Sequence, residues 1–381
     1  MIERRTTIDA IRGLCLVNIF VNHLDGGYLF HLSPSRLGFS DSSEVFVLLS
    51  GISTSLAFSK RPHPVDVAGL VRPLWVRAMR LHTFNIALIL ATLALLALIL
   101  EIRGPIGEVT GDAALLRDHG PWTMFWHAVT FRQTVGYSSV LRLYVVLMLI
   151  APVLLRLAAW RWWAPIPPAL ITWAIAGHFD LVLPNSLSGQ PFALTILPWT
   201  LLFATGIALG RAMTLDVPLP HSGSALALSL AYLATYPMLA AIVIRVSPDA
   251  LEWAEHRNAS FWFGASKTYQ SPLRFLHVMA LAYVVAAAPR APLIRLLYRM
   301  GPDHPLSRLG RNSLLVFTVG AVAAVAVSEM LHLVRIHVTD VLAARIAIEL
   351  ALTGIFIRAA LCLSPKASRP GRSAPAVPAM A

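Results

Sequence analysis

The sequence predicts an all-α, polytopic membrane protein with about ten transmembrane helices and with both termini in the cytoplasm. Three observations lead to this fold class. Of the 381 residues, 57% are hydrophobic and only 13% are charged, which is typical of chains embedded in lipid. Apolar windows of about 20 residues, the length that crosses ~30 Å of hydrocarbon, recur along the chain. The Lys and Arg residues between these windows gather on alternate sides of the predicted membrane.

Ten windows account for most of the chain, and their order sets the predicted topology. If the N-terminus is cytoplasmic, the inside segments hold nineteen Lys and Arg residues and the outside loops hold seven. This bias follows the positive-inside rule and supports an even number of spans. The predicted spans are 7–24, 43–59, 81–100, 140–157, 163–183, 192–210, 223–244, 274–289, 312–332 and 340–362. The second span contains Glu44 and many small polar residues, so it suits a buried helix or a re-entrant segment.

The rest of the composition narrows the class of protein. The membrane domain is expected over 1–363, followed by a Pro-, Ser- and Ala-rich tail over 364–381 that is predicted to be disordered. The formal net charge of +12 is scattered between spans and comes with no nucleic-acid-binding motif, so no nucleic-acid partner is expected. Cys15 and Cys362 both fall in predicted spans without metal-ligand spacing, which predicts neither a disulfide nor a metal site. Asp9 and Arg12 interrupt the first apolar run, so we expect an uncleaved span rather than a signal peptide.

The first span carries the candidate chemistry. Its sequence, TIDAIRGLCLVNIFVNHL over Thr7–Leu24, places ionisable and amide side chains inside a membrane-length helix. Ionisable groups within lipid are costly, so they face a protein interior or a watery cavity and are functional candidates. Eleven residues of helix bring His23 round to the face of Arg12, ~16 Å away along the axis. We therefore expect one continuous internal cavity lined by both residues; the alternative is an Asp–Arg pair that anchors the helix end, with a packed histidine.

Five ordered stretches resemble the glucan succinyltransferase (OpgC) family, a branch of the membrane acyltransferase-three group. Arg12 and His23 meet the Arg-x10-His spacing of the wider group, and Tyr144 falls in a Leu-Tyr motif typical of the family. In the fourth stretch, Asn312 occupies a position where many members have His. The stretches are IDAIRGLCLVNIFVNHLDG, GFSDSSEVFVLLSGISTSLAF, VLRLYVVLMLIAPVLLRL, LSRLGRNSLLVFTVG and PFALTILPWTLLFATGIALG. The last lacks the Asn-Pro pair expected upstream, which bears on the fine detail of the substrate.

The resemblance implies an integral O-acyltransferase of the bacterial inner membrane. It would move an acyl group, succinyl in the type members, from cytoplasmic acyl-CoA to a hydroxyl of a periplasmic glucan or related glycan, without a cofactor. A neutral imidazole can deprotonate an attacking hydroxyl, a role that fits His23, and arginines can bind the donor's anionic groups. The expected catalytic residues are His23, Glu44 and Asp41. The expected substrate-binding residues are Asp9, Arg12, Asn22, Ser50, Gly51, Arg72, Arg77, Arg80 and Tyr144.

Several of these residues have a structural interpretation as well. Arg72, Arg77 and Arg80 can equally be ordinary positive-inside anchors. Ser50 and Gly51 can line a narrow acyl channel or allow close helix packing. Two predicted outer loops, 101–139 and 246–272, mix acidic residues with Trp and Tyr, which suits either sugar binding or an interfacial aromatic belt.

Two other classes of function compete with the acyltransferase. A transporter or flippase for a glycan or lipid could use the embedded Asp, Arg and His as a proton relay. Transporters usually carry paired repeats with broken helices, and the first two spans have no repeat partner in this sequence. A non-catalytic membrane partner of a glucan-synthesis machine is the third possibility. Mutation separates the classes, because an enzyme would lose glycan modification while export continues, whereas a flippase would lose export.

Overall fold

The computed structural model describes residues 2–24, 28–29, 33, 38–58, 67–103, 111–218, 220–246, 261–337 and 342–365, with backbone alone at 2–5, 67–68, 103, 239–246, 329–337 and 342. These residues form an all-α fold that contains no β-strand in the described ranges. The helices are α1 (Ile2–Asn22), α2 (Ser42–Phe58), α3 (Val67–Arg103), α4 (Asp112–His119), α5 (Pro121–Val129), α6 (Ser139–Trp160), α7 (Ile166–His178), α8 (Ile196–Thr214), α9 (Gly223–Val246), α11 (Pro272–Ala287), α12 (Pro292–Arg299), α13 (Pro305–Arg311), α14 (Ser313–His337) and α15 (Leu342–Cys362).

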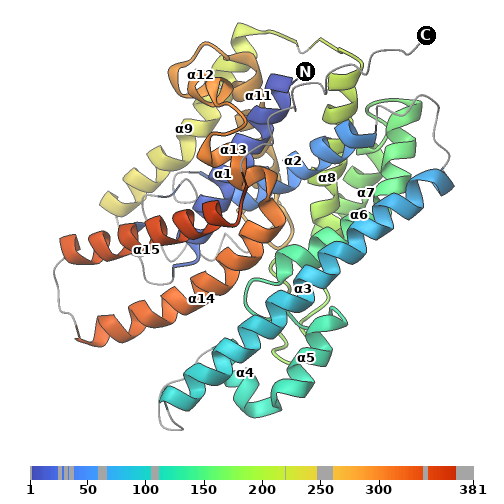
Figure 1. The fold of residues 1–381 in the computed structure, drawn as a ribbon. Helices are drawn as coiled ribbons and strands as arrows, with labels where there is room; N and C mark the ends of the chain where they lie inside the picture. Colours follow the sequence, from blue (N-terminus) through green and yellow to red (C-terminus); the bar gives the residue numbers. More distant parts are fainter. Residues whose placement is uncertain are drawn as a thin grey trace, which may run out of the picture.

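Three helix pairs make up the centre of the molecule. Helix α2 packs along α8, α1 along α13, and the long α3 along α6 (Figure 1). Helices α14 and α15 lie side by side, and α14 also contacts α3 and α1. The predicted tail falls almost entirely at 366–381, outside the described residues. The architecture places α1 against α2, α13 and α14, so side chains on one face of α1 point into the interior.

Glycines set the closest of these helix contacts. A Cβ added to Gly51 of α2 would lie 2.3 Å from the backbone oxygen of Phe203, and one added to Gly206 of α8 would lie 2.3 Å from that of Leu48. A Cβ on Gly13 of α1 would lie 2.0 Å from the carbonyl oxygen of Leu306. No side chain fits at these positions, so the backbones touch directly, as small residues permit in membrane helix packing. Gly51 is therefore a packing residue.

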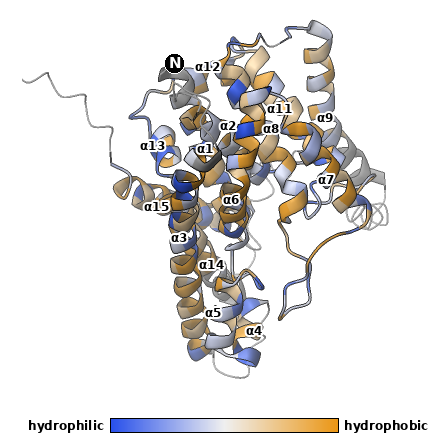
Figure 2. Ribbon diagram, turned by 90° about the vertical axis from the view of Figure 1, so that its right-hand side faces the viewer, coloured by the Kyte–Doolittle hydropathy of each residue, from blue (hydrophilic) through white to orange (hydrophobic). Residues whose placement is uncertain are grey.

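Fewer helices have the length and composition of a membrane span than the sequence predicted. Among the described residues, α3, α6 and α8 qualify, and the count rises to five if the bent pairs α11–α12 and α13–α14 each form one span. Figure 2 shows apolar colouring along much of α3, α6 and α14. Helix α7 replaces the predicted span 163–183 but has only 13 residues, ~20 Å, which is too short for ~30 Å of hydrocarbon. The prediction of about ten spans thus stands only in part, and cytoplasmic termini stay a prediction.

The third predicted span was placed too late in the sequence. It was expected at 81–100, but α3 begins at Val67 and continues for 37 residues. Residues 67–80 were left out of the predicted span because three arginines lower the hydrophobicity of this stretch. Arginine is nevertheless a good helix former, so the helix can begin there. Trp75 Nε1 donates a hydrogen bond of 3.3 Å to the carbonyl oxygen of Leu149, midway along α6. Arg77 and Arg80 therefore lie beside the first half of α6 rather than beyond its end.

Candidate acyl-transfer site

A cavity of about 450 Å³ lies where α1, α2, α3 and α6 meet the start of α14; we call it the arginine cavity. Among the described residues, its lining includes Arg12, Arg77, Arg80 and Arg311, and no acidic residue. Guanidinium groups bind carboxylates and phosphates through paired, charge-assisted hydrogen bonds. A volume of this size is typical of sites for small ligands. The arginine cavity is therefore suited to an anionic ligand of moderate size.

The two ends of the arginine cavity differ in exposure. Arg80 and Arg311 are exposed, whereas Tyr144 and Ser50 have only 4% and 3% of their surface exposed. Nε of Arg12 is buried and has no hydrogen-bond partner within the described part of the chain. Unpartnered buried donors are costly, and a bound ligand can satisfy them. The arrangement suits an elongated ligand that enters past Arg80 and Arg311 and reaches towards Arg12.

The first turn of α14 completes one wall of the arginine cavity. Helices α13 and α14 meet at a bend of 95° at Asn312, and residues 312–315 line the cavity. Asn312 Nδ2 donates a hydrogen bond of 3.0 Å to the carbonyl oxygen of Arg308, so its amide holds the bend. A helix start carries partial positive charge and leaves backbone N–H groups without intrahelical partners. This wall adds to the attraction of the cavity for anions.

The remaining residues predicted to bind substrate lie elsewhere. Arg72 is exposed on α3 and is absent from the lining of the arginine cavity, so it matches the membrane-anchor interpretation better. Gly51 packs against α8, as described above. Asp9 brings its backbone carbonyl against Gly310, where an added Cβ would lie 1.8 Å from the carbonyl oxygen. Asn22 is the last residue of α1. None of these four lines the arginine cavity.

His23 lies one residue beyond the end of α1, where its backbone is held firmly. Its carbonyl oxygen accepts hydrogen bonds from the hydroxyls of Ser328 at 2.8 Å and Tyr137 at 3.2 Å. The imidazole stacks on the Tyr137 ring with centroids 3.7 Å apart. These contacts satisfy a carbonyl that a helix end would otherwise leave free and fix the direction of the side chain. Within the described ranges, His23 is thus positioned by Ser328 and Tyr137 and not by a carboxylate.

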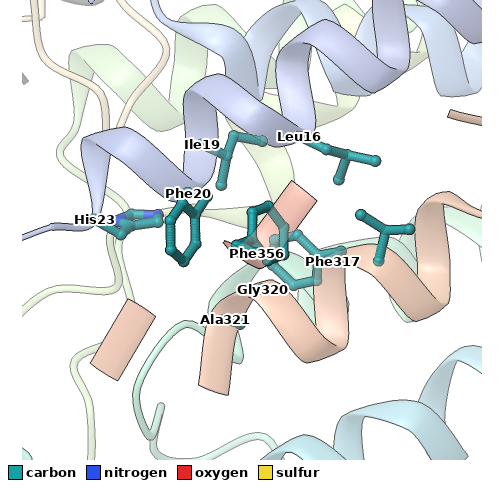
Figure 3. A pocket seen from close by; sticks show the side chains of 9 residues that line it. Leu16, Ile19, Phe20, His23, Phe317, Gly320, Ala321 and Phe356 are labelled. Carbon is teal, nitrogen blue, oxygen red and sulfur yellow. The ribbon is translucent and has the colours of Figure 1, made fainter. Parts of the chain in front are cut away.

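His23 does not line the arginine cavity. It lines a separate space of about 10 Å³, which we call the His23 chamber (Figure 3). The other lining residues within the described ranges are apolar: Leu16, Ile19, Phe20, Val316, Phe317, Gly320, Ala321 and Phe356. The expectation of one continuous cavity is wrong for this structure, because Arg12 and His23 line two separate spaces, which share Phe317 as a lining residue. The sequence spacing places Arg12 and His23 on the same side, but it cannot report Phe317, which lies far along the chain on α14 and lines both spaces.

Asp41 and Glu44 pair with cations from the segment around α11. Arg274 Nε donates to Glu44 Oε1 at 2.6 Å, and Lys267 Nζ donates to Asp41 Oδ2 at 2.6 Å. Arg274 Nη2 also reaches Asp41 Oδ2 at 3.4 Å. The Glu44 side chain has none of its surface exposed. In the described ranges neither carboxylate hydrogen-bonds His23, so both acids act on the cations and on the start of α2 instead.

The pKa of the Asp41 carboxyl group, which lies in the loop before α2, is set mainly by the cations beside it. Burial alone raises the pKa of its carboxyl group, but the ammonium of Lys267 and the guanidinium of Arg274 more than offset this effect. The pKa therefore lies well below its usual range. The Asp41 backbone N–H donates to Glu44 Oε2 at 3.0 Å, and Asp41 Oδ1 accepts from the Ser43 N–H at 2.7 Å. The second of these bonds closes a turn at the start of α2, so the ion network also fixes how α2 begins.

Several functional candidates escaped the sequence reasoning. Ser40 Oγ lies 2.7 Å from His277 Nδ1, and both residues are buried. Arg274 and His277 lie one turn apart on α11, and an ionisable residue in a predicted span was the available signal. Arg311 was counted as an inside anchor, and Lys267 as a loop charge. Most of the predicted outer loop 246–272 falls at 247–260, outside the described residues. No group of three or more His, Cys, Asp or Glu side chains in the described ranges could hold a metal ion.

Comparison with known proteins decides the family. The family model described as OpgC protein matches residues 4–367, which is nearly the whole chain. The chain belongs to the OpgC family. No curated protein and no solved structure matches it. Membership of this bacterial family implies a membrane-associated acyl- or succinyltransferase that acts on a glucan. The match covers both the arginine cavity and the His23 chamber, so the site belongs to the shared family region.

Proposed function

We propose that this OpgC family member is an O-acyltransferase that moves an acyl group, succinyl in the first instance, from cytoplasmic acyl-CoA to a hydroxyl of a periplasmic glucan. One observation carries the proposal. The arginine cavity, whose described lining holds four arginines and no acid, lies against the same face of α1 that leads to His23. The cations suit the phosphates of coenzyme A, and the imidazole suits removal of the proton from the acceptor hydroxyl as this attacks the thioester.

The donor end of the reaction uses the arginine cavity. Arg80 and Arg311, both exposed, would meet the phosphates first. Arg12, whose buried Nε has no protein partner among the described residues, would donate to polar atoms further along the donor, and Tyr144 lines the same cavity. A cavity of about 450 Å³ holds part of a coenzyme A thioester rather than the whole molecule, so the nucleotide would extend past the exposed arginines.

The transfer step uses His23 as general base. The acceptor hydroxyl oxygen attacks the thioester carbonyl carbon, a C–O bond forms, and the C–S bond breaks. The hydroxyl proton passes to the imidazole of His23 and then to the departing thiolate, which leaves as coenzyme A. A hydroxyl is a weak nucleophile at neutral pH, so its deprotonation during attack accounts for much of the catalysis.

The acceptor would approach from the side of Lys267 and Asp41. The Lys267 side chain is 35% exposed and that of Asp41 is 15% exposed, so both can hydrogen-bond sugar hydroxyls. Glu44 is fully enclosed, and its role would be to hold Arg274 and the start of α2. The protein would lie in the bacterial inner membrane with about ten spans and both termini in the cytoplasm, which places the donor and acceptor on opposite sides.

Acyl transfer by purified protein in nanodiscs tests the proposal. Release of free thiol from succinyl-CoA and acetyl-CoA is measured with and without a glucan acceptor, and mass spectrometry detects the ester on the glucan. Acceptor-dependent thiol release with ester formation supports the enzyme. Mass spectrometry of periplasmic glucans from deletion and parent cells gives the second readout. Normal modification with blocked glucan export would favour the flippase instead.

A further inference from the structure

The arginine cavity and the His23 chamber are consecutive along two helices. On α1, Arg12 lines the first, and Leu16, Ile19 and Phe20 line the second before His23. On α14, residues 313–315 line the first, whereas Gly320 and Ala321 line the second. Phe317 lines both spaces. The two cavities therefore follow one another in the same order on α1 and α14 and meet at a single aromatic ring.

The chamber is closed in this structure. Its volume of about 10 Å³ is close to the room that one water molecule needs. Phe317 is 4% exposed, and the rings of Phe20 and Phe356 stack with centroids 4.1 Å apart (Figure 3). A thioester bound at Arg12 would have to cover most of the ~16 Å to His23 through this aromatic packing. It cannot do so while Phe317 keeps its present position.

We propose that the His23 chamber is the acyl site and that Phe317 is its movable wall, which turns aside to let the thioester arm reach His23. The inference rests on the proposed function and adds the place where the acyl carbonyl and its neighbouring methylenes bind. Apart from His23, the described residues that line the chamber are apolar, which suits methylenes and excludes water from the thioester. Side chains turn between discrete rotamers without a change of fold, so Phe317 can move locally.

Gly320 sets the width of the acyl site. A Cβ added at this position would lie 3.0 and 3.1 Å from the Phe356 ring, so the ring would have to shift. Gly354 on α15 offers a matched control, because a Cβ added there meets nothing within 4 Å. Valine at either position adds the same side chain to a helix, but only at Gly320 does it occupy the chamber. The comparison separates loss of the acyl site from loss of helix stability.

The test compares Gly320→Val, Gly320→Ala and Gly354→Val in two assays. In a His23→Ala background, where the donor stays intact, binding of succinyl-CoA, acetyl-CoA and free coenzyme A is measured by calorimetry. We expect acyl-CoA to bind more tightly than free coenzyme A. Gly320→Val should abolish this difference in affinity, while its affinity for free coenzyme A stays within about twofold of that without the substitution. With His23 present, Gly320→Val should lower acyl transfer at least tenfold, Gly320→Ala should lower it less, and Gly354→Val should match the parent protein.

Each outcome bears on one of the two claims. If Gly320→Val and Gly354→Val both keep the same extra affinity for acyl-CoA over free coenzyme A, the acyl-site assignment is overturned, whatever the transfer rate. An active parent protein whose Gly320→Val variant transfers normally would overturn it as well. Absence of transfer by the parent protein with every donor would count against the proposed function alone, because the binding comparison needs no turnover. Coenzyme A affinity serves as the folding control, since coenzyme A lacks the group that the chamber would hold.

Discussion

Arg12 on α1 and His23, one residue beyond the end of this helix, line two different cavities, which share Phe317 among the described lining residues. The cation faces a polar cavity of about 450 Å³, and the imidazole faces an apolar space of about 10 Å³. This division separates donor binding from proton transfer in space. Substitutions on the two sides should therefore affect different kinetic constants, which gives the proposed mechanism direct tests.

The arginines of α3 should differ in effect according to whether they line the cavity. Arg77→Ala should weaken coenzyme A binding about tenfold or more, because a charge-assisted contact to phosphate is lost. Arg72→Ala is the matched control, since Arg72 is exposed on the same helix and lies outside the lining. Calorimetry with coenzyme A gives both affinities. Equal losses in the two variants would mean that overall positive charge, and not the cavity, attracts the donor.

Removing Arg274 should destabilise the fold strongly. Arg274→Ala would leave the Glu44 carboxylate buried without its cation, a loss that typically costs about 3–5 kcal/mol. Arg117→Ala breaks an ion pair whose side chains are 49% and 56% exposed, and such pairs contribute about 0–1 kcal/mol. Thermal unfolding in detergent should show a large drop for the first variant only. Similar unfolding temperatures for both would contradict the buried network.

The lowered pKa of Asp41 predicts how stability depends on pH. A carboxyl group whose folded pKa lies below its unfolded value of ~3.9 stabilises the fold above that pH. This contribution is lost as the pH falls from ~4 towards the folded pKa. Asp41→Asn should therefore be less stable than the parent protein at pH 5–8, and the gap should narrow below pH 4. A gap that stays constant down to pH 3 would show that Asp41 is not held ionised.

Reporter fusions can test the topology that the loop charges predict. Fusions after Leu215 and Pro302 should report the cytoplasm, and a fusion after Thr130 should report the periplasm, because positively charged loops stay inside. The opposite pattern at Pro302 would reverse the side from which the exposed Arg311 meets a ligand. It would then place the arginine cavity on the acceptor side and remove the case for a cytoplasmic donor.

Sequence spacing was sufficient where the feature is local to one helix. The Arg12–His23 face follows from helical periodicity alone, and the embedded charges indicated an interior site. The site as a whole depends on contacts between distant segments, which periodicity does not report. Phe317, which lies far along the chain from His23, lines both cavities, and Arg274 pairs with Glu44 although the two are 230 residues apart in the sequence. The start of α3 was missed for a different reason, since charged residues lower hydrophobicity without disfavouring helix.

The acyl-transfer activity of His23→Ala decides whether His23 is the general base. The imidazole is held by stacking on Tyr137, and the backbone carbonyl of His23 is held by two hydroxyls, so alanine should leave the end of α1 in place. Loss of a positioned general base typically lowers the rate about 10²–10⁴-fold. Coenzyme A binding should stay near that of the parent protein, because His23 is absent from the arginine cavity.

Arg12→Ala should show the reverse pattern, with weakened donor binding, since a guanidinium can hold an anion but cannot accept a proton. Turnover of acyl-CoA with a glucan acceptor and calorimetry with coenzyme A separate the two effects. Near-parental turnover by His23→Ala would leave His23 as a packed histidine at a helix end and would require another base for the acceptor hydroxyl.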